Sequence, residues 1–112
     1  MANPERDLNE MVEVGLRLAA ARQAMDLKQV QVCAAIAVQP NTYSQWESGK
    51  RLADPLAVAR FCDLYGITMD WIYRGQIGAL PHSIADKVQA EYRRLSAIRE
   101  LAKRRREPKR RA

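Results

Sequence analysis

Polar side chains that could recognise another molecule gather in one short stretch, VQPNTYSQWESGKR, which spans Val38 to Arg51. Tyr43 and Trp46 are three residues apart, so on a helix both point inward with Val38. Asn41 and Gln45, together with Thr42 and Ser44, remain on the outer faces. An Asn or Gln amide can pair with adenine N6 and N7, and a threonine offers a methyl for thymine or a hydroxyl for phosphate. The alternative is a solvated helix face with no target.

The sequence contains no comparable set of residues for catalysis or for metal binding. His82 stands alone in a predicted linker, and no carboxylate pair, nucleophile–base set or phosphate loop is evident, so we expect no enzyme. A zinc site needs about four ligands, whereas the chain has two Cys and one His. Cys33 and Cys62 lie among apolar residues at helical spacing, which indicates reduced, buried thiols. We therefore expect neither a metal nor a cofactor.

The net charge of +6 is unevenly distributed. The last ten residues, KRRREPKRRA, carry seven Lys or Arg against one Glu and so account for all of it. The other 102 residues are neutral, so the basic composition says little about the folded part. The tail 103–112 is predicted to be disordered, and it serves either as a set of nonspecific phosphate contacts or as a solubilising tail.

Hydropathy argues against a membrane protein. No run of about 18 apolar residues occurs. The first 15 residues are acidic and lack the basic start and apolar centre of a signal peptide. These features predict a cytoplasmic protein, associated with the nucleoid when it is bound to DNA.

Hydrophobic periodicity predicts an all-α chain with no strands or internal repeats. Gly49, Gly66 and Gly75 are expected to end helices, and Asp54, Thr68 and Ser83 to cap helix starts. The predicted parts are an N-terminal arm at 1–11, helices near 12–25, 29–36, 40–47, 55–65 and 69–74, a linker at 76–82, a helix at 83–102 and the basic tail.

The helices at 29–36 and 40–47 are joined by only about three residues. Pro40 suits the first position of the second helix, because it needs no backbone N–H there. Two short helices joined so tightly must cross steeply, which is the geometry of a helix-turn-helix. An ordinary helical corner has the same geometry.

The residue pattern over 14–75 favours the first alternative. Leu27 and Gln29 open the 29–36 helix, Ala37-Val38 forms the turn, WESGKR closes the next helix, and YGITMDWIYRG makes a fifth. This combination resembles the Cro and lambda-repressor-like (XRE-type) family of helix-turn-helix regulators, in an unbroken five-helix register. The resemblance implies a lambda-repressor-like domain over 12–75, followed by the C-terminal helix and the basic tail.

The resemblance implies that the 40–47 helix enters the DNA major groove. Family base contacts fall on Pro40, Asn41 and Gln45, and Thr42 joins them as a candidate. Pro40 departs from the usual polar residue, so it could only touch a thymine methyl or space the helix. Ser44 is a candidate for either a base contact or a phosphate contact.

The resemblance places other residues beside this helix. Gln29 is expected at a phosphate, and Lys28 replaces the usual Ser or Thr cap with a further candidate phosphate contact. Lys50 and Arg51 are expected to clamp the DNA backbone, with a plain solvated loop as their alternative. An arginine and a glutamate are paired in the family, and the register predicts a structural ion pair of Arg22 with Glu47.

An apolar seam with one charged interruption runs along the 83–102 helix. Two alternatives stay open for it: a dimerising helix, or a helix that packs back on its own domain. Helix-turn-helix readers commonly bind two half-sites as dimers, so we expect a homodimer. The candidate interface residues are Ile84, Val88, Tyr92, Leu95 and Ile98.

These observations favour a bacterial, sequence-specific regulator of double-stranded DNA, a repressor of prophage or chromosomal type acting on a palindromic operator. A first alternative is a DNA-binding antitoxin that holds a partner protein through residues 76–112. A second is a protein-interaction module that has lost DNA binding. Pull-down of a co-expressed partner, or absence of duplex affinity, would separate them.

Overall fold

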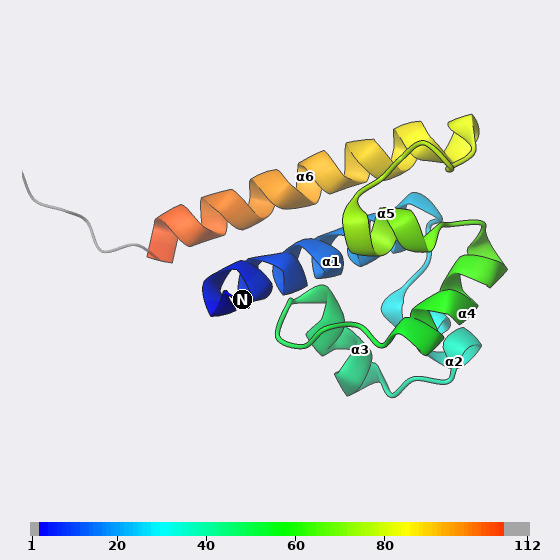
Figure 1. Ribbon diagram of the computed structural model, residues 1–112, viewed down its shortest axis with the longest axis horizontal. Helices are drawn as coiled ribbons and strands as arrows, with labels where there is room; N and C mark the ends of the chain where they lie inside the picture. The colour runs from blue at the N-terminus through cyan, green and yellow to red at the C-terminus, as the bar shows by residue number, and fades with distance from the viewer. Residues whose placement is uncertain (1–2, 107–112) are drawn as a thin grey trace, which may run out of the picture.

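The computed structural model of the protein describes residues 3–106. Within this range there are six helices and no strand, which confirms the all-α prediction (Figure 1). The helices are α1 (Pro4–Ala24), α2 (Gln29–Ile36), α3 (Pro40–Glu47), α4 (Pro55–Tyr65), α5 (Met69–Arg74) and α6 (His82–Arg106).

The N-terminal arm predicted at 1–11 is wrong for the residues that the structure describes, because α1 begins at Pro4. The Asn3 side chain accepts hydrogen bonds from the N–H groups of Glu5 and Arg6, at 3.1 and 3.4 Å. An Asn cap followed by Pro at the first helical position is a strong helix start. Pro4 therefore opens the helix instead of excluding it.

Two of the three predicted caps are present. Asp54 accepts from the Ala57 N–H at 3.0 Å, and Thr68 accepts from the Trp71 N–H at 3.1 Å. The Ser83 cap is wrong, because α6 already begins at His82. There the Pro81 carbonyl accepts the N–H groups of Ile84 and Ala85, at 3.0 and 2.9 Å.

The end of α6 also differs from the prediction. Lys103–Arg106, assigned to a disordered tail, continue the helix, and residues 107–112 lie outside the described residues. Lys and Arg are good helix formers, and their positive charge is favourable at a helix C-terminus. Helix formation therefore extends into the basic segment.

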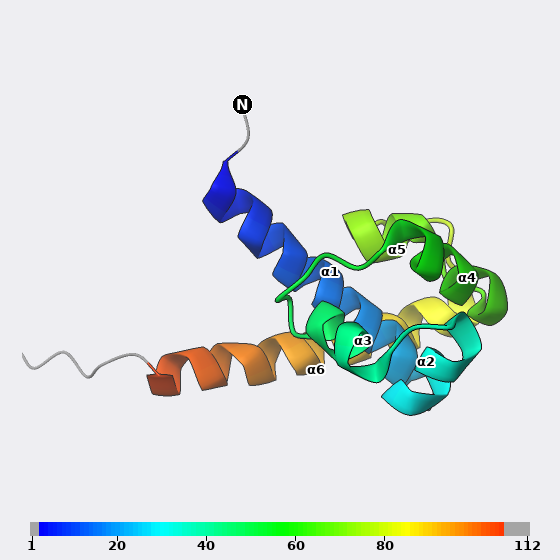
Figure 2. The same cartoon turned by 90° about the horizontal axis from the view of Figure 1, so that it is seen from below.

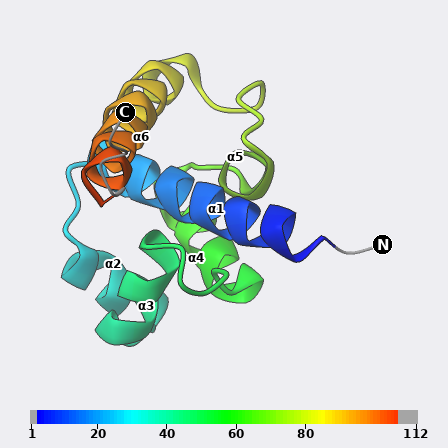
Figure 3. The same ribbon diagram turned by 90° about the vertical axis from the view of Figure 1, so that its left-hand side faces the viewer.

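Helix α1 is the centre of the fold and packs against α3, α5 and α6. It lies between α6 on one side and the α2–α3 pair on the other (Figure 3). The largest fully buried side chains come from every helix and form one core: Tyr43, Phe61, Leu18, Ile36, Ile72, Val32, Val58 and Val88.

Gly15 allows α1 and the end of α3 to approach very closely. A Cβ atom at Gly15 would meet the carbonyl oxygens of Trp46 and Glu47, the latter at 2.7 Å. No other residue fits there without moving one helix. Helix α3 is thus held against the centre of the domain by backbone contact as well as by side chains.

The first half of α6 packs on its own domain. Val88 is fully buried, Ala85 is nearly so, and the Tyr92 ring lies edge-on to Trp71 with centroids 5.9 Å apart. The Tyr92 hydroxyl donates to Glu13 on α1. Of the two alternatives for the seam, packing back onto the chain therefore holds for this half, and Val88 is not available to a second copy.

Candidate nucleic-acid interface

The turn between α2 and α3 is built from backbone hydrogen bonds and one arginine. Ala37 adopts a left-handed conformation, with φ 58°, and the Val38 N–H donates to the Cys33 carbonyl at 3.0 Å. Arg60 on α4 donates from Nε and Nη2 to the Ile36 carbonyl, at 3.1 and 2.9 Å. A guanidinium thus satisfies a carbonyl that the end of α2 would otherwise leave free.

Helix α3 divides into an inner and an outer face, as its sequence predicts. Tyr43 and Trp46 are 0% and 5% exposed, and their rings pack at a centroid distance of 5.9 Å. The remaining polar side chains stay accessible. Asn41 and Ser44 are exposed, and Thr42 and Gln45 are partly buried.

Pro40 occupies the first position of α3 and is exposed. Its ring has neither a donor nor an acceptor, so the start of the helix presents an apolar surface. The hydroxyls of Thr42 and Ser44 and the amides of Asn41 and Gln45 all offer a donor and an acceptor. Only the two amides can pair with adenine N6 and N7 in a bidentate manner.

Arg22 and Glu47 lock the end of α3 to α1. Arg22 donates from Nε to Glu47 Oε2 at 2.7 Å and from Nη2 to Oε1 at 3.0 Å. Its Nη1 donates to the Leu27 carbonyl just before α2, at 2.8 Å. Burial lowers the pKa of Arg22, but the Glu47 carboxylate more than offsets this and the pKa is raised. The expected ion pair is present, and it ties three segments together.

Gln29 has a role that the sequence did not indicate. Its Nε2 donates to Glu47 Oε1 at 2.9 Å, so it is a third partner of the ion pair. An amide nitrogen carries two N–H groups. One is taken by Glu47, which leaves one for the phosphate contact that the resemblance implies.

Lys28 and the loop after α3 flank the helix-turn-helix. Lys28 is exposed, and its backbone N–H donates to Gln31 Oε1 at 2.7 Å, which is the bond that the third helical residue makes in a capping box. The backbone N–H groups of Lys50 and Arg51 both donate to the Gln45 carbonyl, at 3.0 and 3.2 Å. Both side chains are exposed beside the C-terminal turn of α3.

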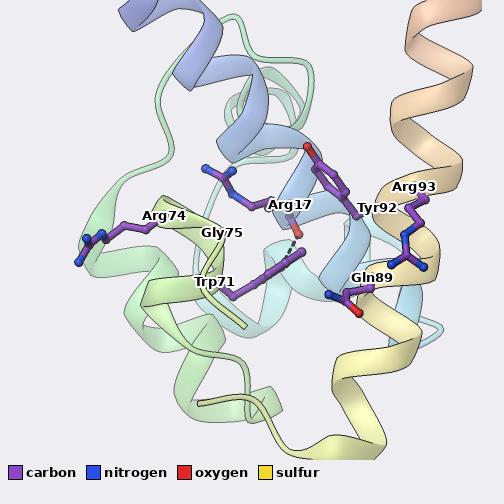
Figure 4. A pocket seen from close by; sticks show the side chains of 7 residues that line it. All are labelled: Arg17, Trp71, Arg74, Gly75, Gln89, Tyr92 and Arg93. Atoms are coloured by element: carbon purple, nitrogen blue, oxygen red, sulfur yellow. Dashed lines mark hydrogen bonds between the residues drawn. The ribbon is translucent and has the colours of Figure 1, made fainter. Parts of the chain in front are cut away.

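Arg17, like Arg60, has a structural role that the sequence did not indicate. It donates from Nε to the Ile72 carbonyl at 2.9 Å and from Nη2 to the Tyr73 carbonyl at 3.2 Å, at the end of α5. Trp71 Nε1 returns a bond of 3.3 Å to the Arg17 carbonyl (Figure 4). An arginine within the apolar run of α1 is the sequence feature that could have indicated this role.

A pocket of about 400 Å³ adjoins these residues, and three of its lining side chains are Arg17, Arg74 and Arg93 (Figure 4). Two Arg17 nitrogens are already engaged by backbone carbonyls, and the other two arginines are exposed.

Over residues 3–106 no group of three or more His, Cys, Asp or Glu could hold a metal ion. No described helix combines the length and the apolar character needed to cross a bilayer.

The geometry defines an all-helical helix-turn-helix protein, whose helix α3 is anchored on one face and polar on the other. Residues 13–70, more than half of the chain, match a family described as a helix-turn-helix domain, and the protein belongs to that family. It is thus of the class of DNA-binding regulators. No curated protein and no solved structure matches the chain.

Proposed function

We propose that the protein is an XRE-type transcriptional repressor that binds double-stranded DNA as a homodimer, with α3 in the major groove. The observation that carries this proposal is the division of α3 between a buried aromatic face and an accessible polar face. A helix whose inner face is fixed at Tyr43 and Trp46 holds its outer amides in one orientation. Such preorganisation is what direct readout of base edges requires.

Asn41 and Gln45 are the proposed base readers, and Thr42 and Pro40 flank them. Lys28, Gln29, Ser44, Lys50 and Arg51 are the proposed phosphate contacts. Phosphate contacts position the protein and base contacts give it specificity, so the two groups should behave differently when they are mutated.

The test compares affinities for a selected duplex and for duplexes altered at single base pairs. Asn41→Ala or Gln45→Ala should lose about 1–3 kcal/mol of discrimination at one position of each half-site. Lys50→Ala and Arg51→Ala should weaken binding to all the duplexes alike. Gln76→Ala, which removes an exposed amide outside the helix-turn-helix, should change neither quantity. Unaltered discrimination in both α3 variants would rule out α3 as the reading helix.

A further inference from the structure

The second half of α6 forms one wall of a groove that no part of residues 3–106 fills. The groove has a volume of about 600 Å³. Leu16 and Ala19 of α1 line it on one side, and Leu95, Ile98 and Ala102 of α6 line it on the other. Ile98 is 51% exposed, which is high for an isoleucine beside a buried leucine and alanine. The groove therefore includes an accessible apolar strip between α1 and α6.

The rim of this groove on the α6 side is basic. Arg99, Lys103 and Arg106 line it and are exposed. Within residues 3–106 none of them forms a salt bridge. An occupant with an apolar stripe and acidic flanks would match both features.

The basic residues also disfavour a dimer in which the two α6 helices pack against each other. Two α6 helices packed against each other through Ile98 would bring Arg99 and Lys103 of both copies together, and like charges placed so close destabilise a pair. A symmetric α6–α6 seam is thus disfavoured in the very half of the helix that its own domain leaves exposed. The occupant of the groove should be acidic.

The first turns of α1 have the required chemistry. Glu5 and Asp7 are exposed and, within the described part of the chain, neither forms a salt bridge. Leu8, which follows Asp7, is 60% exposed, and Met11 and Val12 are only partly buried. These three apolar residues recur at three and four, so they form a stripe on one side of the helix.

The two segments also lie where a second copy can reach them. The first turns of α1 and the last turns of α6 both project beyond the rest of the domain, in different directions (Figure 2). Each chain thus carries one acidic, projecting helix end and one basic, apolar groove. In a two-fold dimer the helix end of each copy can dock in the groove of its partner. Both grooves are then occupied, so the assembly stops at two copies.

We propose that the α1 start of one copy, Pro4–Glu13, docks in the groove between α1 and α6 of a second copy, and reciprocally. This inference deepens the homodimer of the proposed function. Gln29 and Glu47 also line this groove. The docked helix therefore lies beside the ion pair that holds α3, and dimerisation fixes the separation of the two recognition helices.

DNA is the other polyanion that a basic rim could bind. The apolar surface of Leu16, Ala19, Leu95 and Ile98 favours a protein segment, because a phosphate backbone gains nothing from it. The two occupants make different predictions for the mass of the protein in solution.

The experiment measures the mass of the full chain by sedimentation over a concentration series. The wild type should be a dimer. Arg99→Glu with Lys103→Glu reverses the charge of the groove rim, and Glu5→Lys with Asp7→Lys reverses the charge of the helix end. Each double variant alone should raise the dimer dissociation constant by roughly tenfold or more. An equimolar mixture of the two should recover a heterodimer, because the reversed charges are again opposite.

Arg93→Glu with Arg104→Glu is the matched control. It makes the same change in net charge at exposed α6 positions away from the groove, so its dimer should equal that of the wild type. Circular dichroism checks that all variants fold. A monomeric wild type, or a mixture that does not recover the dimer, would overturn the proposal. So would an unchanged mass in the Arg99→Glu/Lys103→Glu variant with a selective loss of duplex affinity, which would assign the groove to DNA.

Binding to a duplex with a single half-site separates this proposal from the proposed function. The Arg99→Glu/Lys103→Glu variant should bind that duplex as the control variant does, because the two carry the same net charge. If it does, a failure of the dimer leaves DNA recognition intact. If even the wild type binds no duplex, the proposed function fails irrespective of the dimer.

Discussion

The guanidinium of Arg22 holds both carboxylate oxygens of Glu47, with Nε 2.7 Å from Oε2 and Nη2 3.0 Å from Oε1. The two side chains are 11% and 7% exposed. This pair joins the last turn of α1 to the last residue of α3. It therefore fixes the orientation of the helix that carries Asn41 and Gln45.

Removal of one partner should be costly. Glu47→Ala should lower the free energy of unfolding by about 3 kcal/mol, because it leaves the Arg22 charge buried without its partner. Urea denaturation measures the change. Glu10→Ala breaks the pair with Arg6, whose side chains are 75% and 61% exposed, and should cost at most about 0.5 kcal/mol. Similar losses in the two variants would contradict a special role for the buried pair.

Gly15→Ala should destabilise the protein although alanine is the better helix former. The added Cβ meets the backbone carbonyls of Trp46 and Glu47, which cannot move as a flexible side chain would. We expect a loss of about 2 kcal/mol or more in thermal or urea unfolding. Gly78→Ala is the control, because a Cβ there meets nothing within 4 Å. If Gly15→Ala were as stable as Gly78→Ala, the close contact of α1 with α3 would be wrong.

Two tyrosines, the buried Tyr43 and the half-buried Tyr73, should respond differently to loss of the hydroxyl. Among the described residues the Tyr43 hydroxyl has no hydrogen-bond partner, and burial first, then the Glu47 carboxylate, raise its pKa. Tyr43→Phe should be neutral or stabilise by up to about 1 kcal/mol. The Tyr73 hydroxyl donates to the Ala53 carbonyl at 2.9 Å, so Tyr73→Phe should cost about 1–2 kcal/mol. A comparable loss at both positions would show that Tyr43 has a partner in solution.

Cys62 should make the stability fall at alkaline pH. Burial, with a smaller contribution from Asp63, raises the pKa of its thiol to about 11. The folded state therefore favours the neutral thiol, and that preference is fully present below the unfolded pKa of about 8.5 and lost as the pH rises towards 11. Between pH 8 and 10.5 the wild type should lose more stability than Cys62→Ala. Parallel pH profiles for the two proteins would refute this linkage.

The sequence predicted the positions that depend on local patterns. Pro40, Gly49 and the buried pair of Tyr43 with Trp46 follow from propensity and helical spacing. The all-α class follows in the same way. The ion pair of Arg22 with Glu47 came only from the family resemblance, since 25 residues separate the two.

What the sequence could not predict depends on contacts between distant segments. The Gln29 amide reaches Glu47 only after α2 and α3 have packed, and Arg60 and Arg17 reach carbonyls 24 and 55 residues away. The seam on α6 left open whether the helix packs on its own domain or on a second copy, because the cover that α1 and α5 give to its first half depends on tertiary contacts. Pro4 was misassigned because proline marks both loops and helix starts, and only the Asn3 cap separates them.

The central claim is that α3 reads base pairs in the major groove, and selection of bound duplexes from a random pool tests it most directly. We expect enrichment of one sequence with two-fold symmetry, whose half-sites lie about one turn of DNA, ~34 Å, apart. The same selection with Asn41→Ala or Gln45→Ala should relax one position in each half. A pool that shows no enriched sequence with the wild type would contradict the account.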